Sequence, residues 1–283
     1  MNISDALAIT GQLKGSSDSP ELDVELLLCH ILEKDRTFLF VHRDYQLAED
    51  QQSQFEQLIQ RRLQGEPIAH LTGSRGFWTL DLEVNPTTLI PRPDTECLVE
   101  KALELIPHSV ARVLDLGTGT GAIALALASE CPVWQLIAVD RVAEAAALAE
   151  QNRQRIGLDN VAVLQGSWFE PVDGLFEMIV SNPPYIDPLD PHLEQGDLRF
   201  EPVSALIAAD NGLADIRQIA TQAREFLVSG GKLLFEHGYD QAAAVQALLS
   251  ELDYTDIESA QDYGGNDRIT WATWEKEKTP NAE

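Results

Sequence analysis

The side chains best suited to chemistry lie in one short segment, Asn182-Pro183-Pro184-Tyr185. The apolar residues 178–180 before it predict a buried strand, so the segment lies where that strand ends. Proline has no backbone N–H and a fixed φ, which leaves its carbonyl as a rigid acceptor. An asparagine side-chain oxygen beside such a carbonyl makes a pair of acceptors that suits a planar NH2 group. The segment therefore indicates chemistry on an amide or exocyclic amine nitrogen, with a purely rigid turn as the alternative.

A glycine-rich segment, residues 115–121, lies between a predicted strand and a predicted helix. Glycines let the backbone turn tightly and approach a ligand without interference from a Cβ atom. Asp140 ends the next predicted strand, where a carboxylate can accept both ribose hydroxyls of an adenosine-containing cofactor. The residues expected to bind a cofactor are Asp115, Gly117, Thr118, Gly119, Thr120, Gly121, Asp140, Trp168 and Asn182.

The glycine pattern alone does not separate NAD from S-adenosylmethionine, because with Ala122 it satisfies G-x-G-x-x-G/A. Two features favour S-adenosylmethionine. Asp115 would repel a pyrophosphate but suits a sulfonium and an ammonium group. The Asn182 segment also follows a later strand, at the edge where open α/β sheets bind ligands. Trp168 could lie against the adenine, or it could be a packing residue, as most large aromatics are.

The elements that must position these residues alternate between strand and helix from about residue 111. Such repeats predict a parallel sheet covered on both faces, here closed by an antiparallel hairpin near residues 257 and 268–273. The first seventy residues predict helices, one beginning at Ser19-Pro20-Glu21 and one over 49–63. The expected strands are 113–116, 134–139, 161–164, 178–180 and 232–235, and the expected helices are 122–128, 142–156, 213–228 and 240–251.

Composition restricts the partners of this chain. It has 46 acidic and 20 basic residues, a net charge of −26, whereas phosphate contacts need clustered Lys and Arg. We therefore expect no direct contact with nucleic acid. The three cysteines and six histidines show no metal-ligand spacing, so no metal is expected. The first residues lack the pattern of a signal peptide and no apolar run has membrane-spanning length, which favours a cytoplasmic protein that does not bind membranes.

Three segments together resemble one family: 115–121 with its glycines, Ser181 to Ile186, and Ile-Pro-Arg-Pro-Asp-Thr-Glu at 90–96. Arg-Phe-Glu-Pro at 199–202 and Asp-Tyr-Gly-Gly at 262–265 add to the likeness, which covers nearly the whole chain. The chain resembles the bacterial protein-(glutamine-N5) methyltransferases that act on peptide-chain release factors. The resemblance implies a seven-stranded, Rossmann-like α/β methyltransferase domain that uses S-adenosylmethionine, behind a small helical domain that helps to dock the release factor.

The resemblance also implies roles for individual residues. It places the cofactor on Gly117 to Gly121, Asp140, Trp168 and Asn182, and the substrate on Asn182 to Tyr185. Asn182 and Pro183 would accept the two N–H groups of the substrate glutamine, and Tyr185 would pack against its amide plane. One departure is visible: the family commonly has an acid where this chain has Ser167, which leaves a backbone N–H there to serve the adenine.

We expect residues 1–70 to form the helical docking domain, 71–90 a connector with a short hairpin, 91–276 the methyltransferase domain and 277–283 a frayed tail. The implied partner is a class I release factor with its Gly-Gly-Gln motif, and the expected state is a monomer. The alternatives are an adenine-N6 DNA methyltransferase, a ribosomal-protein glutamine methyltransferase and a non-enzymatic S-adenosylmethionine-binding scaffold.

Arg92 and Glu96 either line the substrate pocket or belong to a stiff linker capped by Asp94.

Overall fold

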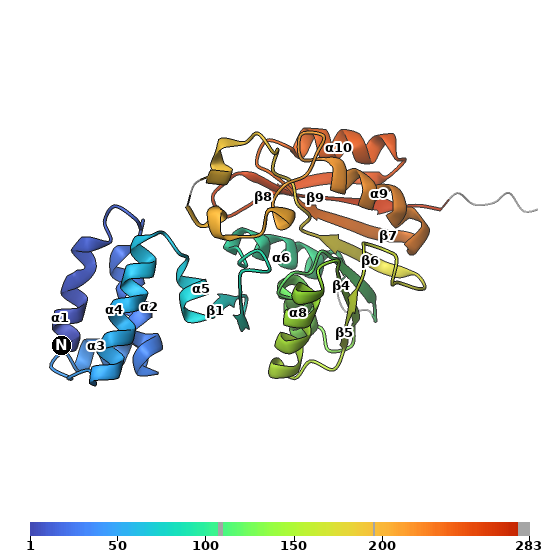
Figure 1. Ribbon diagram of the computed structural model, residues 1–283. Helices are drawn as coiled ribbons and strands as arrows, with labels where there is room; N and C mark the ends of the chain where they lie inside the picture. The colour runs from blue at the N-terminus through green and yellow to red at the C-terminus, as the bar shows by residue number, and fades with distance from the viewer. Residues whose placement is uncertain (107–109, 195, 277–283) are drawn as a thin grey trace, which may run out of the picture. The chain divides into compact units, whose positions relative to one another are not determined.

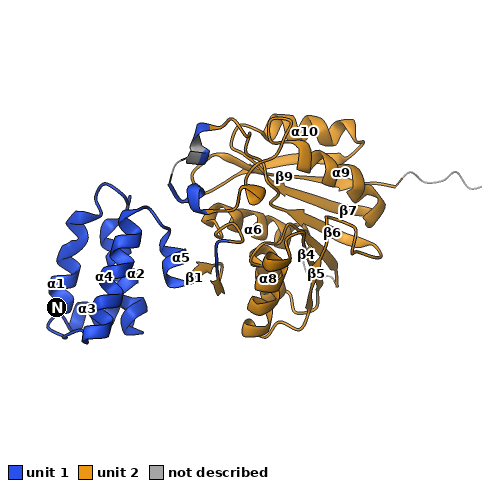
Figure 2. Ribbon diagram, in the orientation of Figure 1, with its two compact units in different colours: residues 1–74, 84–86, 191–200 blue, residues 75–83, 87–190, 201–283 orange. Residues whose placement is uncertain are grey.

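The computed structural model describes residues 1–106, 110–194 and 196–276, so the predicted frayed tail at 277–283 lies outside the described residues. The chain divides into two compact units (Figure 2). Unit 1 comprises residues 1–74, 84–86 and 191–200, and unit 2 comprises the rest of the described chain. Within the described ranges, every helix is too short or too polar to cross a membrane.

Unit 1 is helical. Its core is formed by fully buried side chains such as Leu27, Leu28 and Phe55. Inside it, the Arg62 guanidinium donates to the Asp23 carboxylate at 2.6 Å. Proline in the first turn followed by acids starts the second helix, although Ser19 makes no side-chain capping bond. The helical segments are α1 (Ile3–Leu7), η1 (Ala8–Gln12), α2 (Pro20–Leu32), α3 (Arg36–Val41), α4 (Glu49–Leu63), α5 (Ile68–Thr72), η3 (Pro191–Glu194) and η4 (Gly196–Phe200).

Unit 2 contains a seven-stranded sheet in the order β5-β4-β3-β6-β7-β9-β8. Five neighbouring strands run parallel, and β9 runs antiparallel to both β7 and β8. This confirms the predicted fold class and its closing hairpin. The strands are β3 (Arg112–Leu116), β4 (Gln135–Asp140), β5 (Val161–Gln165), β6 (Phe176–Ser181), β7 (Leu227–Glu236), β8 (Thr255–Gln261) and β9 (Asp267–Trp274); β1 (Ser74–Phe77) and β2 (Leu80–Glu83) form a separate two-stranded sheet.

Helices cover both faces of the large sheet. Successive strand residues point to opposite sides, so the apolar residues of each strand need a covering layer on both faces. Val113 and Met178 belong to the core on one face, whereas Leu114 and Ile179 belong to the core on the other. The first core includes α6 (Glu96–Leu105) and α7 (Ala122–Glu130), and the second includes α9 (Ala214–Phe226) and α10 (Ala242–Glu251). Figure 1 shows α6 and α9 on opposite sides of the sheet. Helix α8 (Ala143–Ile156) connects β4 to β5, and η2 (Pro93–Thr95) and η5 (Val203–Ala205) are single turns.

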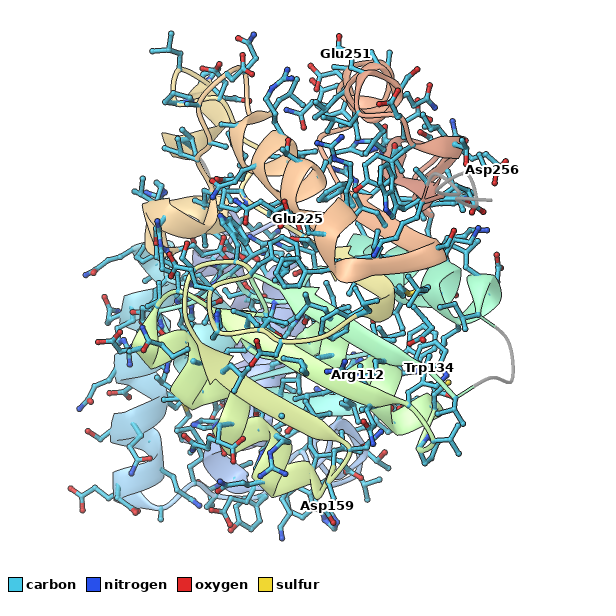
Figure 3. All side chains as sticks on the ribbon, turned by 90° about the vertical axis from the view of Figure 1, so that its right-hand side faces the viewer. Arg112, Trp134, Asp159, Glu225, Glu251 and Asp256 are labelled. Atoms are coloured by element: carbon cyan, nitrogen blue, oxygen red, sulfur yellow. The ribbon has the colours of Figure 1, made fainter. Side chains whose placement is uncertain are left out.

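The residues named for chemistry lie at the edge where the parallel strands end, not at the edge where they begin. Where strands begin, Arg112 donates to the carbonyls of Leu175 and Asp173, and Trp134 is fully buried. Figure 3 labels both side chains. Where strands end, Leu116 aligns with both Val139 and Ser181. The loops after β3, β4 and β6 therefore leave the sheet side by side, which brings together the segments that the sequence indicated for chemistry.

Candidate cofactor and amide-binding site

Asp115 lies inside β3 and is fully buried beneath the loop that follows the strand. Its Oδ2 accepts hydrogen bonds from the Thr118 hydroxyl at 2.6 Å and from the Ala124 backbone N–H at 3.2 Å. Its Oδ1 has no hydrogen-bond partner among the described residues. Burial raises the pKa of this carboxyl to about 7, since removal from water disfavours the charged form. The site thus contains a buried acceptor that a cationic group would satisfy.

The glycine-rich loop takes a backbone path that side chains would obstruct. Gly117, Gly119 and Gly121 all have positive φ, and a Cβ at Gly121 would lie 2.9 Å from the Leu125 side chain. Asp140 ties this loop to the end of β4: its Oδ2 accepts from the Gly119 N–H and its Oδ1 from the Val142 N–H, each at 2.9 Å. Burial raises the pKa of Asp140. Each oxygen retains room for a further donor, such as a hydroxyl.

Trp168 follows β5 and lies over the glycine loop. A Cβ built on Gly117 would be 3.5 Å from the Trp168 ring, so a side chain at this position would touch the indole. Trp168 has a φ of +48°, an uncommon conformation for a large residue. The N–H of Ser167 donates to the Glu170 carboxylate at 3.3 Å. The position that could serve an adenine thus already has an internal partner.

Asn182 follows β6 and is held by Thr95 from a distant part of the chain. Its Nδ2 donates to the Thr95 hydroxyl at 3.3 Å, and its Oδ1 makes no hydrogen bond with the described residues. The neighbouring Pro183 is buried, and its carbonyl also accepts no hydrogen bond from the described part of the chain. Both oxygens that the sequence indicated as acceptors therefore lack a hydrogen-bond partner among the described residues.

Tyr185 is anchored from both ends. Its hydroxyl donates to Glu236 Oε1 at 3.3 Å, and its carbonyl accepts from Gln241 Nε2 at 3.0 Å. Burial raises the pKa of the phenol, with the Glu236 charge adding to the effect. Gly212 packs so closely that a Cβ there would lie 2.0 Å from the Tyr185 carbonyl oxygen. The loop after β6 is thus fixed by its neighbours.

The segment 90–96 both lines the site and is tied to the core. Glu201, whose side chain is fully buried, accepts from the Ile90 N–H at 2.8 Å and from Arg92 Nη2 at 2.6 Å. Glu96 accepts from the Trp78 N–H at 2.8 Å. No side-chain capping bond starts η2 or α6, so the predicted cap by Asp94 is wrong.

One cavity in unit 2 collects most of the residues that the sequence singled out. Asp115, Gly121, Pro183 and Tyr185 are not among the residues that line it. Arg92 and Thr95 line it, whereas Glu96 does not. The predicted residues that line it are Gly117, Thr118, Gly119, Thr120, Asp140, Trp168, Asn182 and Pro184. A concavity lined by a few convergent polar groups is the usual form of a small-molecule site.

Comparison with known proteins decides the family. The family described as PrmC N-terminal domain matches residues 8–73, and the methyltransferase small domain matches residues 94–196. A protein from Escherichia coli (strain K12) described as a release factor glutamine methyltransferase is 55% identical over 256 residues, 90% of this chain and 92% of that protein. A protein of the same description from Vibrio cholerae serotype O1 is 54% identical over 274 residues, 96% of each chain.

This chain belongs to the release factor glutamine methyltransferases. The family resemblance read from the sequence is thereby confirmed. A solved methyltransferase from Pyrococcus furiosus shares the fold, with a TM-score of 0.55 and 17% identity over 81% of this chain and 100% of that one.

The sequence did not predict Thr95, Glu201 or Glu236 as residues of the site in this release factor glutamine methyltransferase. A signal existed for Glu236, because it ends a buried parallel strand just as Asp140 does. Glu201 lies within the Arg-Phe-Glu-Pro segment of the resemblance, but nothing local connects it to Ile90, 111 positions away. Thr95 pairs with Asn182 across 87 positions, which no short-range pattern reveals.

Proposed function

We propose that this chain methylates the side-chain amide nitrogen of the glutamine in the Gly-Gly-Gln motif of class I peptide-chain release factors, with S-adenosylmethionine as methyl donor. Family membership supports the substrate, since relatives up to 55% identical carry that description. The observation that carries the chemistry is Asn182, which lines the cavity and whose Nδ2 donates to Thr95, while its Oδ1 makes no hydrogen bond with the residues that the structure describes.

The residues present fit S-adenosylmethionine. Gly117 to Gly121 leave the loop bare for close approach, and Asp140 offers two oxygens to the ribose hydroxyls. Trp168 lines the cavity and provides an aromatic face, and Asp115 Oδ1 is a buried acceptor with no hydrogen-bond partner among the described residues. An ammonium or sulfonium near Asp115 would stabilise its charged form, whereas a pyrophosphate would be repelled. When bound, the cofactor supplies a methyl group on a sulfonium, which becomes a neutral thioether as the methyl leaves.

Asn182 and Pro183 would orient the substrate amide nitrogen, which is a weak nucleophile. A carboxamide nitrogen is unreactive because its lone pair is delocalised into the carbonyl. With one N–H donated to Asn182 Oδ1 and the other to the Pro183 carbonyl, the nitrogen is aimed at the methyl carbon. Both oxygens stabilise the positive charge that grows on nitrogen as the N–C bond forms. Tyr185 would pack on the amide plane, and a proton leaves the nitrogen after transfer.

The remaining assignments are proposals of the same kind. Residues 1–70 would dock the release factor, with 71–90 as connector and 91–276 as methyltransferase domain. A net charge of −26 favours a basic protein surface over nucleic acid as partner. We propose a monomer that acts in the cytoplasm.

The test is methyl transfer from tritiated S-adenosylmethionine to a purified release factor. Label should appear in the wild-type factor and be absent when the Gly-Gly-Gln glutamine is replaced by alanine. Duplex DNA and ribosomal proteins serve as competing acceptors in parallel reactions. Label that persists in the glutamine-replaced factor, or that appears in DNA instead, would reject the proposed substrate.

A further inference from the structure

A hydroxyl group that the proposed function leaves unused, that of Thr88, belongs to a residue that lines the cavity of unit 2. Thr88 is 2% exposed, and its Oγ1 has no hydrogen-bond partner among the described residues. A buried polar group without a partner destabilises a fold, and nearly all such groups in native proteins are bonded. In a cavity that collects polar residues, this hydroxyl is therefore a candidate contact for a bound ligand.

Thr88 packs against the middle of the glycine-rich loop. A Cβ built on Gly119 would lie 3.8 Å from the Thr88 Cβ. The N–H of Gly119 donates to Asp140 Oδ2 at 2.9 Å. Gly119 thus meets the carboxylate assigned to the ribose through its N–H, and Thr88 through the face on which a side chain would stand. Trp168, which is assigned to the adenine, lies instead beside Gly117, the first glycine of the loop.

The helix that follows the loop adds donors at this place. Helix α7 has nine residues and no side-chain cap. The first four N–H groups of a helix have no partner within it. Two of them are bonded elsewhere, because Gly121 donates to a carbonyl of the loop and Ala124 donates to Asp115 Oδ2. The other two, those of Ala122 and Ile123, make no hydrogen bond with the described part of the chain, and both residues line the cavity.

This combination of donors suits an anion. Free N–H groups at the positive end of a helix favour negative charge. The carboxylate is the one anionic group of S-adenosylmethionine, and it shares a carbon atom with the ammonium. An ammonium near Asp115, which already bonds to the first turn of α7, would place the carboxylate beside that turn. Arg92 also lines the cavity, but its Nη2 is bound to the Glu201 carboxylate at 2.6 Å.

We propose that Thr88 binds the carboxylate of the methionine part of S-adenosylmethionine: its hydroxyl donates to the carboxylate, together with the N–H groups of Ala122 and Ile123. The inference rests on the proposed function, because it takes S-adenosylmethionine as the cofactor. It deepens that function by naming a residue that distinguishes the whole cofactor from one without its carboxylate. Thr88 lies in the predicted connector 71–90, where the sequence indicated no chemistry.

The first test compares Thr88→Val with Thr88→Ser by calorimetry. Valine keeps the shape of threonine but lacks the hydroxyl, whereas serine keeps the hydroxyl. Thr88→Val should weaken the binding of S-adenosylmethionine by about 10- to 100-fold, the effect of deleting one hydrogen bond to a charged group. Thr88→Ser should bind with an affinity close to that of wild type. Wild-type affinity in Thr88→Val would overturn the inference.

The second test changes the ligand. Decarboxylated S-adenosylmethionine keeps the sulfonium and the amine and lacks only the carboxylate, and methylthioadenosine keeps only the nucleoside and a thioether. Wild type should bind the decarboxylated form more weakly than S-adenosylmethionine. Thr88→Val should bind each of these two ligands as well as wild type does. Equal losses for all three ligands would mean that Thr88 contacts the nucleoside or shapes the loop, and would overturn the inference.

Unfolding in urea separates a ligand contact from a structural role. Without cofactor, Thr88→Val removes an unpaired buried hydroxyl and should be at least as stable as wild type, whereas deletion of an internally bonded hydroxyl weakens a fold. Added S-adenosylmethionine should stabilise wild type more than the variant. A clear loss of stability without cofactor would overturn the inference.

One measurement needs no variant to fold. Equal affinity of wild type for S-adenosylmethionine and for its decarboxylated form would also overturn the inference, because no group would then recognise the carboxylate. Failure of the proposed function is a different result. In that case wild type would bind no S-adenosylmethionine, or would transfer no methyl group to a release factor.

Discussion

At the scale of single residues, the two ends of the Asn182 side-chain amide have different roles: one is bonded within the protein and the other is assigned to the substrate. Its nitrogen is held by Thr95, and its oxygen is left for a ligand. A hydrogen bond to a buried internal partner fixes a side-chain amide more firmly than contact with water does, because only one orientation satisfies the partner. The chemistry of the site therefore depends on a contact that lies outside the Asn-Pro-Pro-Tyr segment itself.

Replacement of Asn182 by alanine tests this division. We expect Asn182→Ala to lower kcat by about 10²–10³-fold, the usual effect of deleting one preorganised polar group at the reacting atoms. The affinity for S-adenosylmethionine should change much less, since most cofactor contacts are assigned to the glycine loop and Asp140. Single-turnover methylation of a release factor and calorimetry measure the two quantities. Turnover close to wild type would reject the role given to Asn182.

Asp140 is expected to show the reverse pattern. Asp140→Ala removes the two oxygens assigned to the ribose hydroxyls, so calorimetry should report weaker binding of S-adenosylmethionine. It also leaves the N–H groups of Gly119 and Val142 without their acceptor. Asp140→Asn keeps one acceptor oxygen and should bind with intermediate affinity. Unchanged affinity in Asp140→Ala would count against the ribose assignment.

At the scale of elements, the loop after β6 is rigid because other elements hold its backbone. Gln241, just before α10, donates to the carbonyls of both Tyr185 and Asn211 at 3.0 Å. Gly212 then fits against the Tyr185 carbonyl with no room for a side chain. The position of Tyr185 thus depends on segments that begin more than twenty residues later.

Substitution of Gly212 separates crowding from backbone strain. Gly212 and Gly157 have nearly the same φ, +82° and +81°, but a Cβ at Gly157 meets nothing within 4 Å. Gly157→Ala should lose about 1–2 kcal/mol in the free energy of unfolding, the cost of a left-handed alanine. Gly212→Ala should lose more and should also lower kcat, because Tyr185 is displaced. Equal losses in both variants, with kcat unchanged, would show that the contact with Tyr185 is unimportant.

Local patterns were sufficient to predict most elements of unit 2. The strands of the sheet and the helices that cover it differ from prediction by a few residues, and in unit 1 the helix at 49–63 has the predicted bounds. The largest difference is β7, which begins at Leu227, although the sequence predicted a helix over 213–228 and then a strand over 232–235. Gly230 and Gly231 obscured the strand, because glycine is depleted in strands and marks turns.

The hydrogen-bond partners of the amide-binding residues could not be predicted, because each partner is distant in sequence from the residue that it contacts. Glycine spacing and a strand-terminal acid reveal a nucleoside site because the strand–turn–helix unit that builds it is local. The partners of Asn182 and Tyr185, Thr95 and Glu236, lie 87 and 51 positions away. Their contacts follow from the order of strands in the sheet, which places the ends of β6 and β7 together.

At the scale of the whole molecule, acidic groups shape stability in two ways. The chain has 46 acidic residues against 20 basic ones, so self-repulsion grows as pH rises. Two carboxyls, those of Asp115 and Glu236, are in addition fully buried, and burial raises the pKa of each to about 7. Both effects act in the same direction, toward lower stability of the folded state near neutral pH than in mild acid.

The contribution of Asp115 can be isolated by its pH dependence. Its pKa rises from 3.8 in a model peptide to about 7 in the folded protein, so between these values the folded state binds a proton that the unfolded chain releases. The free energy of unfolding must then decrease as pH rises from about 4 to 7, by up to about 1.4 kcal/mol per pH unit for this one proton. Asp115→Asn removes the titration and should flatten the profile by that amount.

Urea unfolding followed by tryptophan fluorescence measures this profile, and all five tryptophans lie in unit 2, so the signal reports on the unit that contains Asp115. Asp159→Asn, at a fully exposed side chain, controls for loss of one carboxylate from the surface. The difference in slope between the two variants isolates the effect of burial. Parallel profiles for wild type and Asp115→Asn between pH 4 and 7 would mean that Asp115 ionises as readily in the folded state as in the unfolded chain, and would contradict the raised pKa that its burial implies.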